Sequence, residues 1–209
     1  MEKYDFIIAG GGAAGLSLAH HLAHSPLGDP SVLIVDRDTK DRTWCFWTDR
    51  PTHFDGIVYR SWDRLRFEGD GLGRTISMEP YRYQMIRGVD LYRFVHQDLS
   101  RRPNVKFLQG TVQRIEDGPE GARVWVGGRE YRGRWAFDSR FSRSQLGPPA
   151  SGYHRLLQQF QGWEIETPES RFDAGAPTFL DFRTPQKGQP RFFYLLPLSG
   201  RRALVEYVA

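Results

Sequence analysis

Three glycines near the N-terminus have the spacing that a dinucleotide-binding turn requires. They form the motif Gly10-x-Gly12-x-x-Gly15, directly after the apolar run at residues 6–9. Glycine at these positions permits a tight turn, a close approach of a pyrophosphate to the backbone, and close packing of a helix on a strand. Asp36 follows 21 residues after Gly15, where its carboxylate can accept hydrogen bonds from ribose hydroxyls. The sequence therefore predicts a nucleotide-binding site.

The segments around this motif predict a strand, a helix and a second strand. Residues 6–9 and 32–35 are short, fully apolar runs, and between them apolar residues recur at helical spacing. A strand, helix and strand of this length are typical of a right-handed βαβ crossover in a parallel sheet. The N-terminus of such a helix offers free N–H groups and a partial positive charge to phosphates.

The predicted cofactor-binding residues belong to the glycine turn and to the end of the second strand. They are Gly10, Gly12, Ala13, Ala14, Gly15, Asp36 and Arg37. A simple tight turn is the alternative, but it does not explain why strand, helix and acid accompany the glycines. These residues leave open whether the nucleotide is FAD or NAD.

Composition places the chain among soluble globular proteins, with 209 residues, 39% hydrophobic and 26% charged. A net charge of +4 suits an anionic cofactor or an anionic membrane surface and does not by itself imply nucleic acid. The single cysteine, Cys45, excludes an intrachain disulfide framework and favours a reducing compartment. No signal peptide or membrane-spanning run is evident, so we expect an intracellular protein.

The rest of the chain predicts two domains. We expect an FAD-binding domain over residues 1–146, with an irregular aromatic insertion at about 43–85, and a partial substrate-binding domain over 153–209. The Gly-Pro-rich segment 147–152 is the candidate linker. Further expected elements are a helix at 90–100, strands at 105–108, 124–126 and 134–138, and an antiparallel hairpin of 192–198 with 203–208.

Several sequence blocks carry a resemblance to known proteins. Residues 4–16, Tyr-Asp-Phe-Ile-Ile-Ala-Gly-Gly-Gly-Ala-Ala-Gly-Leu, resemble the N-terminus of FAD-containing oxidoreductases and hydroxylases. The block Thr-Trp-Cys-Phe-Trp at 43–47 resembles the bacterial lycopene cyclase family, which closes the acyclic ends of carotenoids. Blocks at 138–140, 160–163, 179–183, 194–198 and 204–206 agree with that family in the same order.

This resemblance implies an α/β fold, with a Rossmann-like FAD/NAD(P)-binding domain and an antiparallel β substrate-binding portion. It also implies FAD, reduced by NAD(P)H and used without net redox change, and lycopene or a related acyclic carotenoid as substrate. An acid would protonate the terminal double bond, the C5=C6 bond would attack the carbocation, and proton loss would form a β-ionone ring. The implied location is cytoplasmic, peripheral to the inner face of the cytoplasmic membrane, and no nucleic-acid partner is expected.

Two acidic residues are the predicted catalytic groups. Glu206 falls where the family places an essential acid, and Asp181 lies in the family's other acidic block. In a strand, Glu206 shares its face with Leu204 and Val208, so an apolar setting would raise its pKa and keep it protonated. The alternative for Glu206 is a solvent-facing strand side. The alternative for Asp181 is a structural ion pair with Arg183.

Other signals have ordinary interpretations. Trp44, Phe46 and Trp47 could line a polyene tunnel, although aromatic clusters more often pack in cores. His20, His21 and His24 suggest zinc superficially, but the sequence supplies no third ligand, so no metal site is expected. The arginines between residues 129 and 143 would face solvent or cofactor phosphates rather than nucleic acid.

The sequence departs from the family at its end. Ala209 follows the predicted catalytic glutamate by three residues, whereas relatives continue with a part that completes the flavin site and the substrate tunnel. We therefore expect a C-terminally truncated portion that could need a second chain, a missing C-terminal half. The alternative functions are a related FAD-dependent hydroxylase, monooxygenase or isoprenoid reductase, and an inactive fragment.

Overall fold

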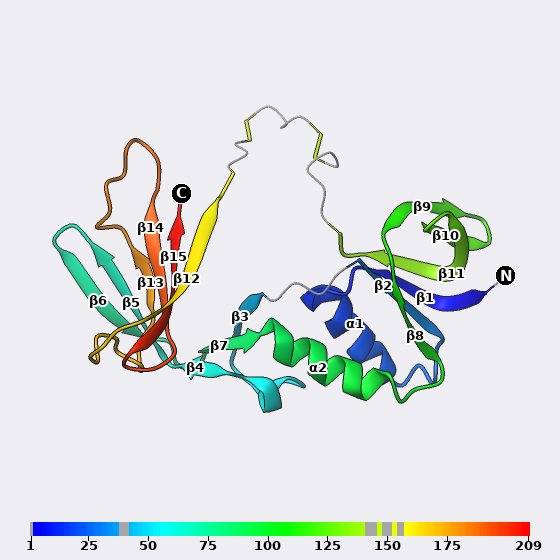
Figure 1. The fold of residues 1–209 in the computed structure, drawn as a ribbon, viewed down its shortest axis with the longest axis horizontal. Helices are drawn as coiled ribbons and strands as arrows, with labels where there is room; N and C mark the ends of the chain where they lie inside the picture. The colour runs from blue at the N-terminus through cyan, green and yellow to red at the C-terminus, as the bar shows by residue number, and fades with distance from the viewer. Residues whose placement is uncertain (1, 38–41, 141–145, 148–151, 154–156) are drawn as a thin grey trace. The chain divides into compact units, whose positions relative to one another are not determined.

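A computed structural model describes residues 2–37, 42–140, 146–147, 152–153 and 157–209 (Figure 1). The chain forms two compact units, and each unit combines two separate segments. The first unit comprises Met1–Trp44 and Arg87–Gly147, and the second comprises Cys45–Ile86 and Pro148–Ala209. None of the described helices has the length and apolar character needed to span a bilayer.

The first unit is built on a six-stranded sheet with the order β8-β2-β1-β11-β10-β9. Its strands are β1 (Lys3–Ala9), β2 (Val32–Asp36), β8 (Val105–Gln109), β9 (Val112–Gly118), β10 (Gly121–Val126) and β11 (Arg129–Asp138). The strands β8, β2, β1 and β11 pair in parallel, and β10 and β9 extend the sheet antiparallel (Figure 1). The two strands of the predicted strand–helix–strand segment, β1 and β2, therefore lie inside this sheet, and both pair in parallel with their neighbours.

The apolar runs of β1 and β2 form the core of this unit because parallel strands are covered on both faces. Ile7, Ile8 and Ala9 are fully buried, as are the side chains of residues 32–35. Two helices, α1 (Ala13–Ala23) and α2 (Gly88–Leu99), pack against each other (Figure 1). The helix expected at 90–100 is thus present and begins slightly earlier.

The second unit contains a six-stranded sheet with the order β12-β15-β14-β13-β5-β6 and a three-stranded sheet with the order β3-β7-β4. The six strands are β5 (Arg64–Gly69), β6 (Leu72–Ser77), β12 (Phe160–Glu166), β13 (Thr178–Asp181), β14 (Phe192–Pro197) and β15 (Arg202–Val208). The smaller sheet has β3 (Thr43–Thr48), β4 (Arg60–Trp62) and β7 (Arg82–Arg87), with a 3₁₀ turn at Asp55–Ile57.

The predicted antiparallel hairpin is confirmed, since β14 and β15 pair from Phe192 with Val208 to Pro197 with Ala203. One pairing differs from the expected antiparallel portion, because β13 and β5 run in parallel. These two strands come from distant parts of the chain, and no short turn joins them.

The structure divides the chain differently from the sequence-based boundaries. The segment expected as an irregular insertion in the first domain, about 43–85, contains β3 to β7, and Cys45–Ile86 packs in the second unit. The reason is the pairing of β5 with β13, which joins this segment to the C-terminal strands. Residues 148–151 of the predicted linker lie outside the described residues.

Candidate functional site

A pocket of about 840 Å³ lies at the carboxyl ends of the parallel strands of the first unit. Four loops line it, after β1, β2, β8 and β11, together with the start of α1. Its lining residues are Gly10, Gly12, Ala13, Ala14, Val35, Asp36, Arg37, Arg42, Trp44, Tyr92, Gly110, Thr111, Val112, Ser139 and Arg140. This edge of an open α/β sheet is where such folds bind ligands, and the volume suits a large one.

The glycine turn has the geometry that the motif predicts. Gly10 has a φ of +112°, a conformation that favours glycine. A Cβ on Gly15 would lie 1.9 Å from the carbonyl oxygen of Gly10, so only glycine allows the helix to start this close to the strand. Gly12 borders open space, since no heavy atom lies within 4 Å of the place that a Cβ would occupy there. The turn thus leaves room for a phosphate group beside the backbone.

The start of α1 is suited to an anion. Its N-cap, Gly12, has an extended conformation and no side chain that could accept from the first-turn N–H groups. The first turn also contains no acidic residue. The unsatisfied N–H groups and the helix dipole therefore favour a negatively charged ligand at this point.

Asp36 ends β2 directly beside the glycine turn. One carboxylate oxygen, Oδ1, accepts from the backbone N–H of Arg37 at 2.7 Å. The other, Oδ2, lies 2.8 Å from the place a Cβ of Gly11 would occupy. The structure thus brings the seven predicted cofactor-binding residues together at the ends of β1 and β2 and the start of α1. Six of them line the pocket, and Gly15 is buried behind it.

Ser139 lines the pocket but was not predicted as a site residue, whereas Arg140 belongs to the arginines expected to face solvent or cofactor phosphates. The hydroxyl of Ser139 donates to the carbonyls of Ala9 and Gly10, each at 3.1 Å, and so fixes the glycine turn. Arg140 pairs with Asp138 and also donates to the carbonyl oxygen of Val112. Residues 138–140 follow an expected strand whose carboxyl end lies beside that of β1, and this pairing was the signal that could have found them.

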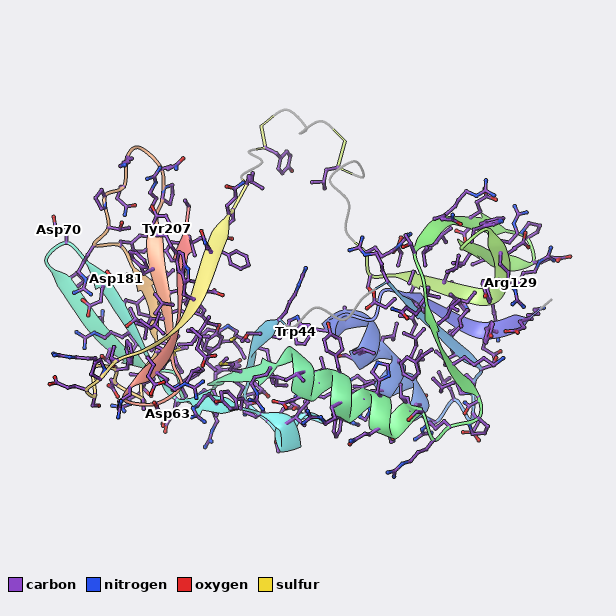
Figure 2. All side chains as sticks on the ribbon, viewed as in Figure 1. Trp44, Asp63, Asp70, Arg129, Asp181 and Tyr207 are labelled. Carbon is purple, nitrogen blue, oxygen red and sulfur yellow. The ribbon has the colours of Figure 1, made fainter. Side chains whose placement is uncertain are left out.

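An aromatic pair forms another wall of the pocket. The rings of Trp44 and Tyr92 meet edge to face, with centroids 5.8 Å apart. Trp44, which was considered for a polyene tunnel, lies near the start of β3 (Figure 2) and lines this pocket. A flat apolar surface next to the free N–H groups at the start of α1 suits a ligand with both an aromatic and an anionic part.

The predicted acid Glu206 lies in β15 on the core side of the second unit's sheet. Tyr194 of β14 stands opposite Glu206 in the register, and Gly162 of β12 stands opposite it on the other side. Because Gly162 has no side chain, the carboxyl of Glu206 extends over it; a Cβ there would lie 3.0 Å from Glu206 Cγ. Burial raises the pKa of Glu206 above its usual value. This is the direction predicted for an acid on an apolar strand face.

A group of polar side chains adjoins Glu206 within the apolar core. The hydroxyls of Tyr83 and Tyr194 are hydrogen-bonded to each other, and both interact with the thiol of Cys45. Burial raises the pKa of all three groups, most strongly for Tyr194, so they are neutral at physiological pH. Glu206 is close enough to Cys45 and Tyr83 that its charge would raise both pKa values further.

Aromatic rings surround this polar group. Phe179 meets Tyr83 and Tyr194 edge to face, with centroids 5.7 and 5.8 Å apart. Trp47 lies 4.4 Å from Tyr83 and 5.8 Å from Phe179 between ring centroids. We call Trp47, Tyr83, Phe179 and Tyr194 the aromatic cluster. The carboxyl of Glu206 lies next to this cluster, opposite Tyr194 in the strand register. The faces of aromatic rings can stabilise a positive charge.

Asp181 has the opposite surroundings. Arg183 donates to its two carboxylate oxygens, from Nε to Oδ1 at 2.8 Å and from the guanidinium to Oδ2 at 2.6 Å. These hydrogen bonds lower the pKa of Asp181 despite its partial burial. The structure therefore places Asp181 in the ion pair that the sequence left as the alternative, and the environment is that of an ionised carboxylate.

The two acids point to opposite faces of one sheet. Asp181 aligns with Phe193 in β14, and Phe193 aligns with Tyr207 in β15, so these three share a face. Neighbouring residues of a strand alternate between faces, which puts Glu206 on the other side. The arginine series lies as expected where it is described: Arg129, Arg132 and Arg134 are at least partly exposed to solvent, and Arg140 lines the pocket, while Arg143 lies outside the described residues.

Solved structures with a similar fold include a probable FAD-dependent monooxygenase. PqsL, a probable FAD-dependent monooxygenase from Pseudomonas aeruginosa, superposes with a TM-score of 0.67 at 14% identity, over 99% of this chain and 60% of that one. A geranylgeranyl bacteriochlorophyll reductase-like protein from Thermoplasma acidophilum gives 0.66 at 13% identity, over 100% and 57%. The p-nitrophenol 4-monooxygenase PnpA from Pseudomonas putida gives 0.63 at 15% identity, over 99% and 57%.

These likenesses show an α/β fold of the FAD-binding type, as the sequence predicted. The chain spans about 60% of the length of the solved structures that it matches. No significant match to the chain is found among curated proteins. The model of the family described as lycopene cyclase protein matches residues 5–209, nearly the whole sequence. The chain therefore belongs to the lycopene cyclase protein family.

Proposed function

We propose that this chain belongs to a flavoprotein that cyclises the acyclic ends of lycopene to β-ionone rings, with Glu206 as the general acid. The observation that carries the proposal is the partly buried carboxyl of Glu206, with its raised pKa, beside the aromatic cluster. Protonation of an alkene requires a carboxyl in its protonated form, and a raised pKa favours that form of Glu206. Family membership supports the substrate class.

The reaction that this arrangement suits involves protons only. The carboxyl of Glu206 gives its proton to the terminal double bond, the C5=C6 bond attacks the resulting carbocation, and one proton leaves as the ring forms. Because one proton is added and one is lost, substrate and product have the same mass. The rings of the aromatic cluster would stabilise the cation, a contribution of about 0.5–2 kcal/mol for each well-placed ring.

The neighbouring hydroxyls keep the acid's surroundings neutral. Tyr83 and Tyr194 satisfy each other and Cys45 by hydrogen bonds, so these three groups do not compete for the proton of Glu206. Their raised pKa values prevent them from becoming anions that would quench a cation. The chain's own residues thus hold the proton at one carboxyl and surround it with rings.

We propose FAD as the nucleotide of the first unit. Gly10, Gly12 and Gly15 with the start of α1 would hold its pyrophosphate, Asp36 its ribose, and Ala13, Ala14 and Arg37 would border it. When reduced by NAD(P)H, bound FAD supplies a negative charge that favours positive charge in a bound substrate. We also propose a peripheral location at the cytoplasmic membrane, since lycopene dissolves in the bilayer.

Expression in bacteria that accumulate lycopene tests the cyclase proposal. We expect pigments of unchanged mass that carry β-rings, lost in Glu206→Gln and retained in Asp181→Asn, the matched control from the same sheet. A pigment of altered mass would favour hydroxylation or reduction and overturn the proposal. Lycopene left unchanged by soluble protein would contradict a self-sufficient cyclase, and restoration by a supplied C-terminal half from a relative would show that a second chain is needed.

The cofactor proposal has a separate test. In Gly15→Ala the added methyl would collide with the backbone of Gly10, so purified protein should lose its flavin absorbance. Gly56→Ala is the control, because a Cβ there meets open space. Protein that never contains flavin, or flavin that survives Gly15→Ala, would contradict this assignment.

A further inference from the structure

The two helices of the first unit bring three metal-ligating side chains together. His20 lies in the last turn of α1, His24 is its C-cap residue, and Asp98 lies in the last turn of α2. His20 Nδ1 is 3.0 Å and His24 Nε2 is 2.8 Å from the same carboxylate oxygen, Oδ2 of Asp98. The three ligand atoms all lie within 4.8 Å of one another.

The cluster is buried on the side of His20 and exposed to solvent on the side of His24 and Asp98. The side chain of His20 is only 6% exposed, and its ring packs against those of His24 and Phe94 at 4.5 and 5.4 Å between centroids. His24 and Asp98 are 37% and 26% exposed, so an ion could reach them from solvent. Burial alone would raise the pKa of Asp98, but the hydrogen bonds from His24 and His20 lower it, which keeps the carboxylate in its ligating form.

We propose that His20, His24 and Asp98 form a binding site for a divalent transition-metal ion of the zinc class. Two imidazole nitrogens and one carboxylate oxygen are a ligand set that Zn²⁺ and Co²⁺ accept, with water in the remaining position. Tetrahedral bonds of about 2.0–2.1 Å place ligand atoms about 3.3 Å apart. Each histidine nitrogen, now 3.0 or 2.8 Å from Oδ2 of Asp98, would move away from it by a few tenths of an ångström, and the two nitrogens, which lie within 4.8 Å of each other, would adjust to the same spacing.

The sequence could not show this site because the third ligand is distant. The two histidines are one helical turn apart, but Asp98 follows His24 by 74 positions and comes near only through the packing of α1 on α2. The alternative is a metal-free hydrogen-bonded contact between the helices. The two interpretations differ in what happens when metal is added.

Arg102 competes with an ion at this site. Its guanidinium lies 3.5 Å from each ring nitrogen of His24. When Nε2 binds a metal, a neutral His24 carries its proton on Nδ1, which then faces another donor. Arg102 must therefore move away, and its positive charge also opposes a cation. Removing the charge in Arg102→Gln should strengthen metal binding.

Calorimetry on the untagged 209-residue chain with Zn²⁺, and the visible absorption of added Co²⁺, test the site. We expect one equivalent to bind, with affinity about tenfold or more weaker in Asp98→Asn and His24→Gln, and tighter in Arg102→Gln. His21→Gln changes an exposed residue of the same helix outside the cluster, and Cys45→Ser removes the only thiol; neither should alter binding.

Circular dichroism without metal establishes that each variant is folded, and Zn²⁺ should raise the melting temperature only where the cluster is intact. Absence of binding to the folded chain would overturn the site. Binding of equal strength in Asp98→Asn and His24→Gln would overturn it as well. Because these measurements need neither flavin nor carotenoid, their outcome is independent of the proposed cyclase activity.

Discussion

Carboxyl groups on the two faces of the second unit's six-stranded sheet have pKa values shifted in opposite directions. On one face Glu206 lies among apolar and aromatic side chains, and burial raises its pKa. On the other face Asp181 lies with Glu68 among arginines, and the hydrogen bonds of Arg183 lower its pKa. The strands are neighbours and the chemical group is the same. The surroundings on each face therefore decide whether the pKa of its carboxyl is raised or lowered.

The largest effect is expected when a new side chain displaces an acid on one face, and the same change on the other face serves for comparison. Val in place of Gly162 would collide with Glu206, since even a Cβ lies 3.0 Å from its Cγ. Displacing a catalytic group by about 1 Å costs on the order of 10²-fold in rate, so we expect a comparable fall in cyclised pigment.

Gly73 offers a matched control on the other face. A Cβ there lies 3.0 Å from Oε2 of Glu68, the same separation from an acidic side chain in the ion-paired group. We expect Gly73→Val to leave the cyclised pigment within a few-fold of the parent. Equal losses in the two variants, with both proteins folded, would contradict a special role for the Glu206 face.

A smaller effect should separate the ring of Tyr194 from its hydroxyl. Tyr194→Phe keeps the ring and removes the hydrogen bond with Tyr83, whereas Tyr194→Leu removes the ring as well. A cation–π contribution of about 0.5–2 kcal/mol corresponds to about 2- to 30-fold in rate. Pigment yield should therefore fall further in Tyr194→Leu than in Tyr194→Phe. Equal pigment yields in Tyr194→Phe and Tyr194→Leu would show that the ring of Tyr194 does not contribute to the reaction.

The smallest expected effect is on stability, and its sign differs between the two acids. Glu206 has a raised pKa when folded, so its stabilising contribution is complete below the ordinary pKa of about 4.3 and is lost as pH rises through the folded value. Asp181 has a lowered pKa when folded, so its contribution is present above about 3.9 and is lost as pH falls through the folded value.

Urea unfolding of the parent, Glu206→Gln and Asp181→Asn across an acidic-to-neutral pH series measures these contributions. With increasing pH, the parent should lose stability relative to Glu206→Gln and gain stability relative to Asp181→Asn. Near neutral pH, loss of the Asp181 ion pair should lower the melting temperature of Asp181→Asn relative to the parent. Differences of the same sign would show that the two faces do not differ as described.

Local sequence patterns were enough to predict several elements of the fold correctly. The apolar runs of β1 and β2, the helical spacing in α1, and the hairpin of β14 with β15 are formed by contacts close in sequence. The alternation of Leu65 and Phe67 with charged neighbours in β5 also marked a strand, although the segment was expected to be irregular. Its place in the second unit depended on the distant pairing with β13, which no local pattern encodes.

The sequence by itself determined the glycine turn, because only glycine fits at Gly10 and Gly15. The alternation of β15 also put Glu206 on the same strand face as Leu204 and Val208. Only the tertiary structure decided the direction of Asp181, since a register shift in β13 between Thr178 and Asp181 turns it to the arginine-lined face. It also decided the meeting of Asp98 with His20 and His24. Backbone geometry and alternation act within a few residues, whereas these contacts depend on how separate strands and helices pack.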